Sequence, residues 1–435
     1  MNSTNKPRKT PQETQAIVER SISKRNWAEK RFKSYGLVAV TAAMAFLFYL
    51  FFVIFSNGIG AFQQTQVRIP VFFDPAIIDP SGRRNVEEMR TADYQAVLRA
   101  ALKAKFPEVE GRVASRELSR LVSGSAAFDL QNEVLANPTI IGKTEPRWLL
   151  ASDAVDLLMK GHVERTLAEA ERPVTDVQLV WIDKLVAEDS LELKFNWTFL
   201  TYGDSREPEK AGIWGAVVGS FYMLLITLLL SFPIGIATAI YLEEFARRNR
   251  WTDLIEVNIN NLAAVPSIVF GLLGLAVFIG FFGLPRSAPL VGALVLTLLT
   301  LPTIIIASRA ALKAVPPSIR EAALGMGASK IQMVTHHVLP LAMPGMLTGT
   351  IIGMARALGE SAPLLMIGMV AFIVDIPKGI TDAATALPVQ VFLWSDSPER
   401  GFVEKTSGAI IVLLAFLVVM NTAAVILRKR FERRW

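Results

Sequence analysis

The sequence predicts an all-α polytopic membrane protein with six transmembrane helices and an α+β domain inserted after the first of them. Hydrophobic residues make up 52% of the 435 residues, and mean hydropathy is +0.39, which is too high for a soluble protein of this size. Six apolar runs are long enough to cross a bilayer. A charged stretch of 148 residues separates the first run from the other five.

The N-terminal part is predicted to hold a cytoplasmic tail and the first transmembrane helix. Residues 1–35 are polar, carry nine Lys or Arg and show no apolar periodicity before Trp27, so they predict a mobile tail or a surface helix. Residues 36–62 contain the first span. Its apolar part, Gly36–Phe55, is 20 residues long, enough at ~1.5 Å per residue for a ~30 Å hydrocarbon core.

Residues 63–210 are predicted to form an independent α+β domain. They hold 19 basic and 24 acidic residues, with Pro and Gly punctuation and no span, and their length suffices for a separate core. Helical periodicity is present in Tyr94–Phe106 and Ser152–Glu171, whereas Val177–Trp181 and Leu191–Leu200 are predicted strands.

Residues 211–427 are predicted to form a second membrane domain of five helices, followed by the basic tail 428–435. The five apolar runs are about Ile213–Leu242, Val257–Phe282, Ala288–Ser308, Gly345–Val374 and Ser407–Leu427.

The basic residues predict the orientation of the spans. Outside residues 63–210 there are 26 Lys and Arg. With a cytoplasmic N-terminus, 21 of them fall in inside segments and four in the two short outside loops. Cytoplasmic loops of membrane proteins carry this excess. Both termini are therefore expected in the cytoplasm, with residues 63–210 on the other side of the membrane.

Composition excludes several kinds of site. The chain has no cysteine and therefore no disulfide or thiolate metal site, and its three histidines cannot build a zinc site alone. Gly325–Lys330 (GMGASK) lacks the G-x-x-x-x-G-K-[ST] spacing of a phosphate-binding loop. We expect no bound cofactor or metal on this chain, no catalytic residue, and no nucleic-acid partner.

The longest polar interruption of the C-terminal half that also looks folded is Glu321–Pro340. Ser318 stands three residues before Glu321, and Ser329 stands three before Gln332. This is the spacing of a capping box, in which the serine accepts from a helix N–H and the Glu or Gln reaches back. Two short helices are therefore predicted.

Glycines and prolines punctuate this predicted unit. Gly325 and Gly327 lie between the two helices, where the chain must stop and turn. Pro340 and Pro344 are expected to close the unit before the next apolar run. The pattern indicates a glycine elbow held at the cytoplasmic membrane surface.

Two charges fall inside the predicted fifth span. Arg356 lies about 11 residues into it, and Glu360 follows one helical turn later on the same face. Charged residues at such depth usually face the bundle interior and serve function. Arg356 is predicted to offer guanidinium donors to a passing oxyanion, with Glu360 orienting it. The alternative is a structural clamp between helices.

The same predicted helix carries a seam of small residues, Gly345, Gly349 and Gly353, continued by Ala357 and Ser361. Such a seam lets a second helix approach closely. Pro363 predicts a kink just beyond Glu360, and comparable breaks are predicted in other spans at Pro233, Pro266 and Pro302.

The polar unit resembles the coupling loop of ABC-importer permeases. That pattern is Glu-Ala-Ala, three residues, Gly, nine residues, then Ile-x-Leu-Pro, and it is matched here by Glu321, Ala322, Ala323, Gly327, Leu339 and Pro340. The departure is His337 in place of Ile. The resemblance implies that the loop docks into a cleft of a separate ATPase subunit.

Further segments of 211–435 resemble PstA-type phosphate permeases. They are Pro233–Ala246, Val265–Leu275, Leu301–Pro316, Ala355–Leu365 (ARALGESAPLL) and Met420–Trp435. The first span and the outer domain resemble the extended form of this family. The resemblance implies the type I ABC importer fold, a PstC-like second permease, a homodimeric ATPase that binds ATP and Mg, and a periplasmic phosphate-binding protein. It also implies the inner membrane as location and inorganic phosphate as substrate.

Three alternatives stay open on the sequence. A membrane receptor would explain one span followed by a folded outer domain, but not the five further spans. An ion-driven transporter would need no coupling loop. A PstC-like, sulfate or molybdate permease subunit would share every feature, because an Arg–Glu pair does not separate one tetrahedral oxyanion from another. Co-purification of an ATPase would exclude the first two.

Overall fold

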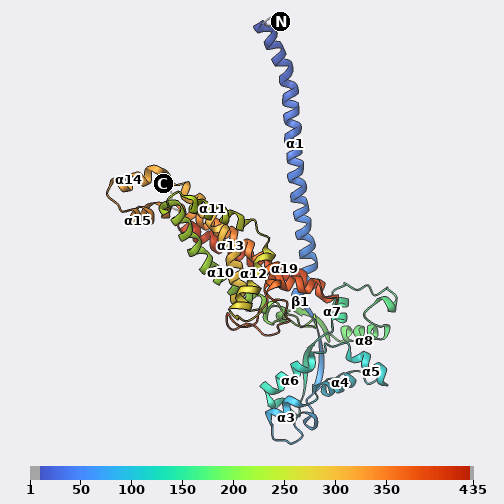
Figure 1. Ribbon diagram of the computed structural model, residues 1–435. Coiled ribbons are helices and arrows are strands. Elements are labelled where there is room, and N and C mark those ends of the chain that lie inside the picture. The colour runs from blue at the N-terminus through green and yellow to red at the C-terminus, as the bar shows by residue number, and fades with distance from the viewer. Residues whose placement is uncertain (1–9, 432–435) are drawn as a thin grey trace. The chain divides into compact units, whose positions relative to one another are not determined.

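The structure, a computed structural model, describes residues 10–431 and divides into two compact units, one up to Ser56 and one from Asn57 onward (Figure 1). The first unit is a single helix, α1 (Pro11–Gly58), of 48 residues. Residues 11–35, predicted as a mobile tail or a surface helix, therefore continue the transmembrane helix without a break. No proline follows Pro11 within α1 to interrupt it. The rest of the predicted tail lies outside the described residues.

In the second unit, η1 (Ile59–Phe62) leads into a three-stranded antiparallel sheet in the order β2-β1-β3. The strands are β1 (Gln63–Phe72), β2 (Thr144–Leu150) and β3 (Leu191–Phe195). Val67 pairs with Leu149 on one side and with Leu191 on the other. Alternate residues of β1 are buried, because one face of the sheet packs on helices.

Residues 63–210 also form short helices, most of which pack on that buried face and complete the core. They are α2 (Pro75–Ile78), α3 (Val86–Thr91), α4 (Tyr94–Lys105), α5 (Arg112–Ser119), α6 (Ala126–Ala136), η2 (Pro138–Ile140), α7 (Asp153–Met159), η3 (Glu169–Glu171), α8 (Asp176–Ala187) and α9 (Trp197–Thr201). Val67, Ile69, Val71 and Phe73 are fully buried among them. The predicted α+β character of this domain is confirmed. We call residues 63–210 the outer domain.

Local predictions within the outer domain had mixed outcomes. The helix predicted at Tyr94–Phe106 is α4. The predicted strand Val177–Trp181 is wrong, because a capping box between Thr175 and Gln178 starts α8 at Asp176. The predicted helix Ser152–Glu171 is helical only over α7 (Asp153–Met159) and over a single 3₁₀ turn, η3, at its end. The predicted strand Leu191–Leu200 is a strand only as far as Phe195.

The outer domain packs on the membrane helices through buried polar contacts. Lys160 Nζ lies 2.7 Å from Asp156 Oδ2 and 2.7 Å from Glu404 Oε1, and all three side chains are nearly buried. Glu404 belongs to the first turn of α19 (Gly401–Phe431). Burial raises the pKa of the neighbouring Asp153 carboxyl to about 6 and that of Glu209 to about 7. The domain is thus fixed to α19 by ionisable groups that water reaches poorly.

Six candidate membrane spans are present among residues 10–431, if one bent pair counts as a single span. Besides α1 and α19 they include α10 (Trp214–Ile240), which continues as the π-helical turn η4 (Tyr241–Phe245), and α13 (Pro289–Lys313). A further span is the helix running from Lys330 to Gly359. The predicted polytopic helical fold is confirmed.

The predicted third span, Val257–Phe282, is the bent pair. Helix α11 (Arg250–Ala263) meets α12 (Ser267–Gly274) and its π-helical extension η5 (Leu275–Phe281) at an angle of 101°. The break lies at Pro266, as predicted. Pro233 and Pro302 instead lie inside α10 and α13, which continue through them, so the breaks predicted there are wrong. Neighbouring helices can satisfy the backbone groups that proline leaves unpaired.

Two short helices complete the membrane domain: α17 (Ala362–Met366) and α18 (Leu387–Ser395). The main apolar core of this domain joins α10, α13, α16 (Leu339–Gly359) and α17 around Val291, Val295 and Leu358. Helices α14 (Pro317–Gly325) and α15 (Lys330–Gln332) lie at the end of the helical bundle away from the sheet (Figure 1).

Candidate functional site

The first helix of the polar unit is α14. Pro317 stands at its first position, where the fixed φ of proline favours helix initiation. The N–H that proline lacks would have no partner within the helix at this position. The helix therefore begins before Ser318, and its N-cap residue, Pro316, makes no side-chain capping bond. The capping box predicted between Ser318 and Glu321 is wrong for this reason. The carboxylate of Glu321 is left exposed on the surface of α14.

The elbow and the second capping box follow the prediction. Helix α14 ends at Gly325, and Gly327 has a φ of +89°, a left-handed conformation that favours glycine. Ser329 Oγ accepts from the backbone N–H of Gln332 at 3.3 Å, and Gln332 Oε1 accepts from that of Ser329 at 2.9 Å. This reciprocal pair starts α15 and sets its direction relative to α14.

The residues of the coupling pattern divide between surface and core. Glu321, Ala322 and Gly327 are exposed, whereas Ala323 is 1% exposed and packs in the cluster around Met333 and Val334. Leu339 and Pro340 are half-buried at the start of α16. Small Ala323 thus lets α14 lie close against the following helix, and Glu321 faces outward.

Three exposed apolar side chains follow Glu321 in the polar unit, on α14, the elbow and α15, and sequence reasoning missed them. Leu324 is 48%, Met326 77% and Ile331 65% exposed. Each is a large apolar residue in an otherwise polar unit, and this contrast is the signal that could have identified them. An exposed apolar patch with a charge at its edge is typical of a protein-binding surface.

Arg320, one residue before Glu321, fixes α14 to two other elements and was also missed. Its guanidinium donates to Glu244 Oε1 from Nη2 at 2.7 Å and to the carbonyl oxygens of Val315 and Leu312 at 2.7 and 2.9 Å. Glu244 is buried in η4, at the end of α10. Charge-assisted bonds of this kind are stronger than neutral ones, so Arg320 connects α14 to α10 and α13.

A second ionic group reinforces the same end of the bundle. Arg309 of α13 lies 2.5 Å from Glu243 and also pairs with Glu256 of α11, and Lys313 lies 3.4 Å from Glu243. Arg309 and Glu243 are 66 residues apart in the sequence. Three membrane helices therefore meet at charged groups directly beside α14.

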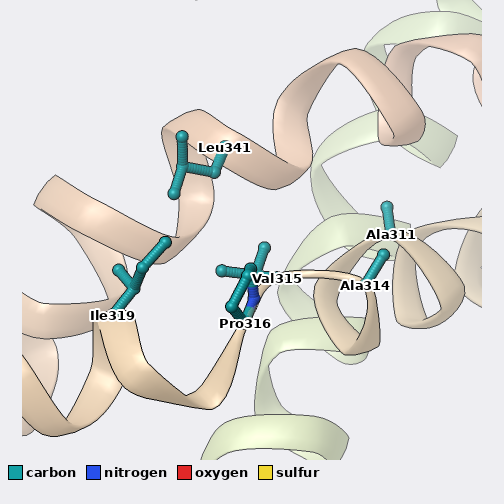
Figure 2. A pocket seen from close by; sticks show the side chains of 6 residues that line it. All are labelled: Ala311, Ala314, Val315, Pro316, Ile319 and Leu341. Carbon is teal, nitrogen blue, oxygen red and sulfur yellow. The ribbon is translucent and has the colours of Figure 1, made fainter. Parts of the chain in front are cut away.

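An apolar pocket of about 410 Å³ lies next to the polar unit Glu321–Pro340, which we now call the coupling unit. Figure 2 shows Ile319 and Leu341 on one side of it and Ala311 and Ala314 on the other, with Val315 and Pro316 between them. The pocket separates Ile319 of α14 and Leu341 of α16 from the C-terminal end of α13 (Figure 2).

The second half of the coupling unit and the next span form one helix. Helix α15 continues through the π-helical turn η6 (Met333–Val338) into α16, giving 30 helical residues from Lys330 to Gly359. Pro340 and Pro344 lie within this helix and do not close the unit as predicted. The wider π turn precedes Pro340 and accommodates its missing N–H.

Arg356 and Glu360 form an ion pair, but not at the middle of a span. The predicted span Gly345–Val374 ends early: α16 stops at Gly359, Glu360 is extended, and Arg356 stands in the last turn. Arg356 Nε lies 3.5 Å from Glu360 Oε1, with the side chains 47% and 21% exposed. Within residues 10–431 the pair makes no ionic contact with another helix, so it does not itself join two helices.

The small-residue seam of α16 packs against α13. A Cβ added at Gly345 would lie 2.7 Å from Ala311 Cβ, and one at Gly349 would lie 2.2 Å from Ala307 Cβ. Gly353 faces Ile304 at 3.7 Å. The predicted close approach is confirmed, with alanines of α13 as the partner surface. In the part of the chain that the structure describes, no group of three His, Asp or Glu could hold a metal ion.

Two family models match the chain. Residues 231–435 match the family described as binding-protein-dependent transport system inner membrane component, and residues 19–169 match a domain of unknown function (DUF3333). The first match contains the coupling unit, α16 and the Arg356–Glu360 pair. The second overlaps α1 and much of the outer domain.

Known permeases are similar over about half of the chain. The phosphate transport system permease protein PstA 1 of Mycobacterium tuberculosis is 31% identical over 238 residues, covering 55% of this chain and 77% of the relative. PstA of Yersinia pestis is 31% identical over 223 residues, 50% and 73% of the two chains. The probable ABC transporter permease protein YqgI of Bacillus subtilis is 34% identical over 172 residues, 40% and 58%.

Among solved structures, the inward-facing MetNI methionine ABC transporter has a chain that is 19% identical, with a TM-score of 0.40. The match covers 51% of this chain and 98% of the transporter chain. The relationship to the permeases rests on the sequence identity and on the match to residues 231–435. The chain belongs to the PstA family of phosphate transport system permease proteins, multi-pass inner membrane components of ABC importers.

Proposed function

We propose that this chain conducts inorganic phosphate across the inner membrane as one permease subunit of an ATP-driven importer. The observation that carries the proposal is 31% identity across 77% of a phosphate permease. The chain itself is a non-enzymatic membrane subunit, and ATP and Mg are expected on a partner ATPase.

The partners are a PstC-like permease, a homodimeric ATPase and a periplasmic phosphate-binding protein. The exposed side chains of Leu324, Met326 and Ile331, in the same unit as Glu321, support the ATPase contact, because α14 and α15 lie at the end of the bundle away from the sheet. Within the second unit, the sheet lies at the end of the bundle opposite α14 and α15 (Figure 1), which supports a periplasmic outer domain opposite a cytoplasmic coupling unit. Cytoplasmic termini are proposed from the distribution of Lys and Arg alone.

Coupling acts through the helix Lys330–Gly359. In the proposed alternating-access cycle, a loaded binding protein docks outside and ATP closes the ATPase dimer. The closing dimer displaces α14 and α15, and the continuous helix transmits this movement to its last turn. The Glu321–Pro340 unit is thus a lever on the element that carries Arg356. Arg320 and the pocket beside Ile319 set how α14 moves against α13.

Arg356 is the proposed phosphate contact. Its side chain is half-exposed and its only ionic partner within the described chain, Glu360, is 3.5 Å away, so guanidinium donors remain for an oxyanion. Glu360 orients the guanidinium and, by its own charge, shortens the residence of the anion.

The test is uptake of labelled phosphate into proteoliposomes that contain the four-component assembly. ATP-dependent accumulation, unaffected by excess sulfate or molybdate, is expected. Accumulation of sulfate or molybdate in place of phosphate would refute the substrate, and failure of an ATPase to co-purify would refute the class of transporter.

A further inference from the structure

The outer domain exposes a group of aromatic side chains on one short segment. Phe195 at the end of β3 is 48% exposed, Trp197 at the start of α9 is 68% exposed, and Tyr202 after α9 is 53% exposed. The rings of Phe195 and Trp197 meet edge to face, with centroids 4.8 Å apart. None of these residues belongs to the buried core of the domain. Helix α9 packs inward through Phe199, which is buried in a cluster with residues of η1, α10, α18 and α19.

Hydrogen bonds tie the first end of this segment to the end of the first span. The backbone N–H of Asn196 donates to the carbonyl oxygen of Phe62 at 2.8 Å, and Asn196 Nδ2 donates to that of Ala61 at 3.0 Å. Asn196 is 1% exposed. Since η1 directly follows α1, Phe195 and Trp197 lie level with the point where the chain leaves the membrane.

The other end of the segment is tied to the next span. The N–H of Trp214, the first residue of α10, donates to the carbonyl oxygen of Tyr202 at 3.0 Å, and Gly212 donates to Gly203 at 2.8 Å. Trp214 is itself 44% exposed. A five-residue helix fixed at both ends to membrane spans stays at the level of the bilayer surface.

The chemistry of these side chains suits that level. Trp and Tyr are enriched at membrane–water boundaries, where the ring contacts acyl chains and the polar atom contacts headgroups and water. A cluster of exposed aromatic rings facing bulk water would be unfavourable and is uncommon on soluble surfaces. Because the segment is continuous with the two spans that flank it, lipid is the surrounding that these rings meet.

We propose that residues 195–202 form a lipid-binding surface, with Phe195, Trp197 and Tyr202 placed in the headgroup layer of the outer leaflet. The segment anchors the outer domain to lipid independently of the buried Lys160–Glu404 contact. This surface is separate from the proposed phosphate path and does not depend on the substrate.

The absence of native cysteine allows a clean test. Trp197→Cys and Tyr202→Cys are each labelled with a nitroxide in the full chain, assembled with its partner subunits in phospholipid nanodiscs. Collision with oxygen, which partitions into lipid, is compared with collision with a water-soluble nickel chelate. The matched control is Val113→Cys in α5, 79% exposed on the part of the outer domain away from the bundle (Figure 1).

Both segment labels are expected to collide several-fold less with the chelate than the label at 113, and more with oxygen. Chelate collision at 197 and 202 equal to that at 113 would place the segment in water and overturn the proposal. Protection from both reagents would show a protein partner over the surface and would overturn it as well. ATP-dependent uptake by each labelled protein confirms that it is folded.

Discussion

Replacing Gly349 by alanine is expected to force α16 away from α13. The added Cβ would lie 2.2 Å from Ala307 Cβ, whereas ordinary contact begins at 3.4 Å. The two backbones must therefore separate locally by at least the difference of 1.2 Å. Overpacking of this size in a close-packed interior costs roughly 1–3 kcal/mol.

The same geometry predicts a rescue. In the double variant Gly349→Ala with Ala307→Gly, the new Cβ has its nearest partner in the Cα of residue 307, at 3.6 Å, which is an ordinary contact. Stability is expected to return to near the wild-type value. Gly359→Ala on the same helix is the matched control, because a Cβ there meets nothing within 4 Å.

Two assays follow the effect. The thermal unfolding temperature of the detergent-extracted protein measures the packing of α16 against α13. The rate of ATP-dependent phosphate uptake measures coupling through the helix that contains α16. The single variant should be less stable and should transport more slowly, since α16 connects the coupling unit to Arg356. A single variant as stable as Gly359→Ala, or a double variant no better than the single, would refute the packing argument.

Other predictions concern the coupling unit, the proposed path and the outer domain. Glu321→Lys should abolish ATP-dependent uptake while the protein remains in the membrane, and wild-type uptake would contradict the coupling role. Arg356→Gln should lower phosphate flux more than assembly, measured by co-purification; failed assembly would favour a structural role. Arg320→Ala leaves the buried Glu244 carboxylate without its partner and should lower the free energy of unfolding by roughly 1–3 kcal/mol, less in the double variant with Glu244→Gln; equal losses would refute the pairing. The raised pKa of Glu209, about 7 against an ordinary 4.5, means that the folded state binds the extra proton, so this stabilisation is complete below about pH 4.5 and is lost as pH rises through 7. Unfolding midpoints across this range should fall with pH, and Glu209→Gln should flatten the change; an unchanged slope would contradict the burial of this group.

Features that depend on neighbours in sequence could be predicted. The apolar runs indicated the membrane fold, because every backbone group in lipid must be satisfied within a helix. The Ser329–Gln332 box, the Gly327 elbow and the seam of Gly345 and Gly349 are also local patterns, set by side chains three or four residues apart.

Predictions failed where two local signals competed. Pro317 favoured helix initiation over the Ser318–Glu321 box, and the Thr175–Gln178 box overrode the β-branched run that follows it. Apolar character alone could not locate the end of α16, because the stretch from Ala362 to Val374 is also apolar but does not continue the helix.

The sequence by itself determined the membrane class, the inserted domain and the identity of the residues at the coupling unit and the charged pair. Only the tertiary structure decided what they contact. Arg320 reaches Glu244 across 76 residues, and Lys160 reaches Glu404 across 244. Such pairs form because helix packing brings buried charges together, and burial makes each partner necessary to the other. No spacing rule along the chain encodes that proximity.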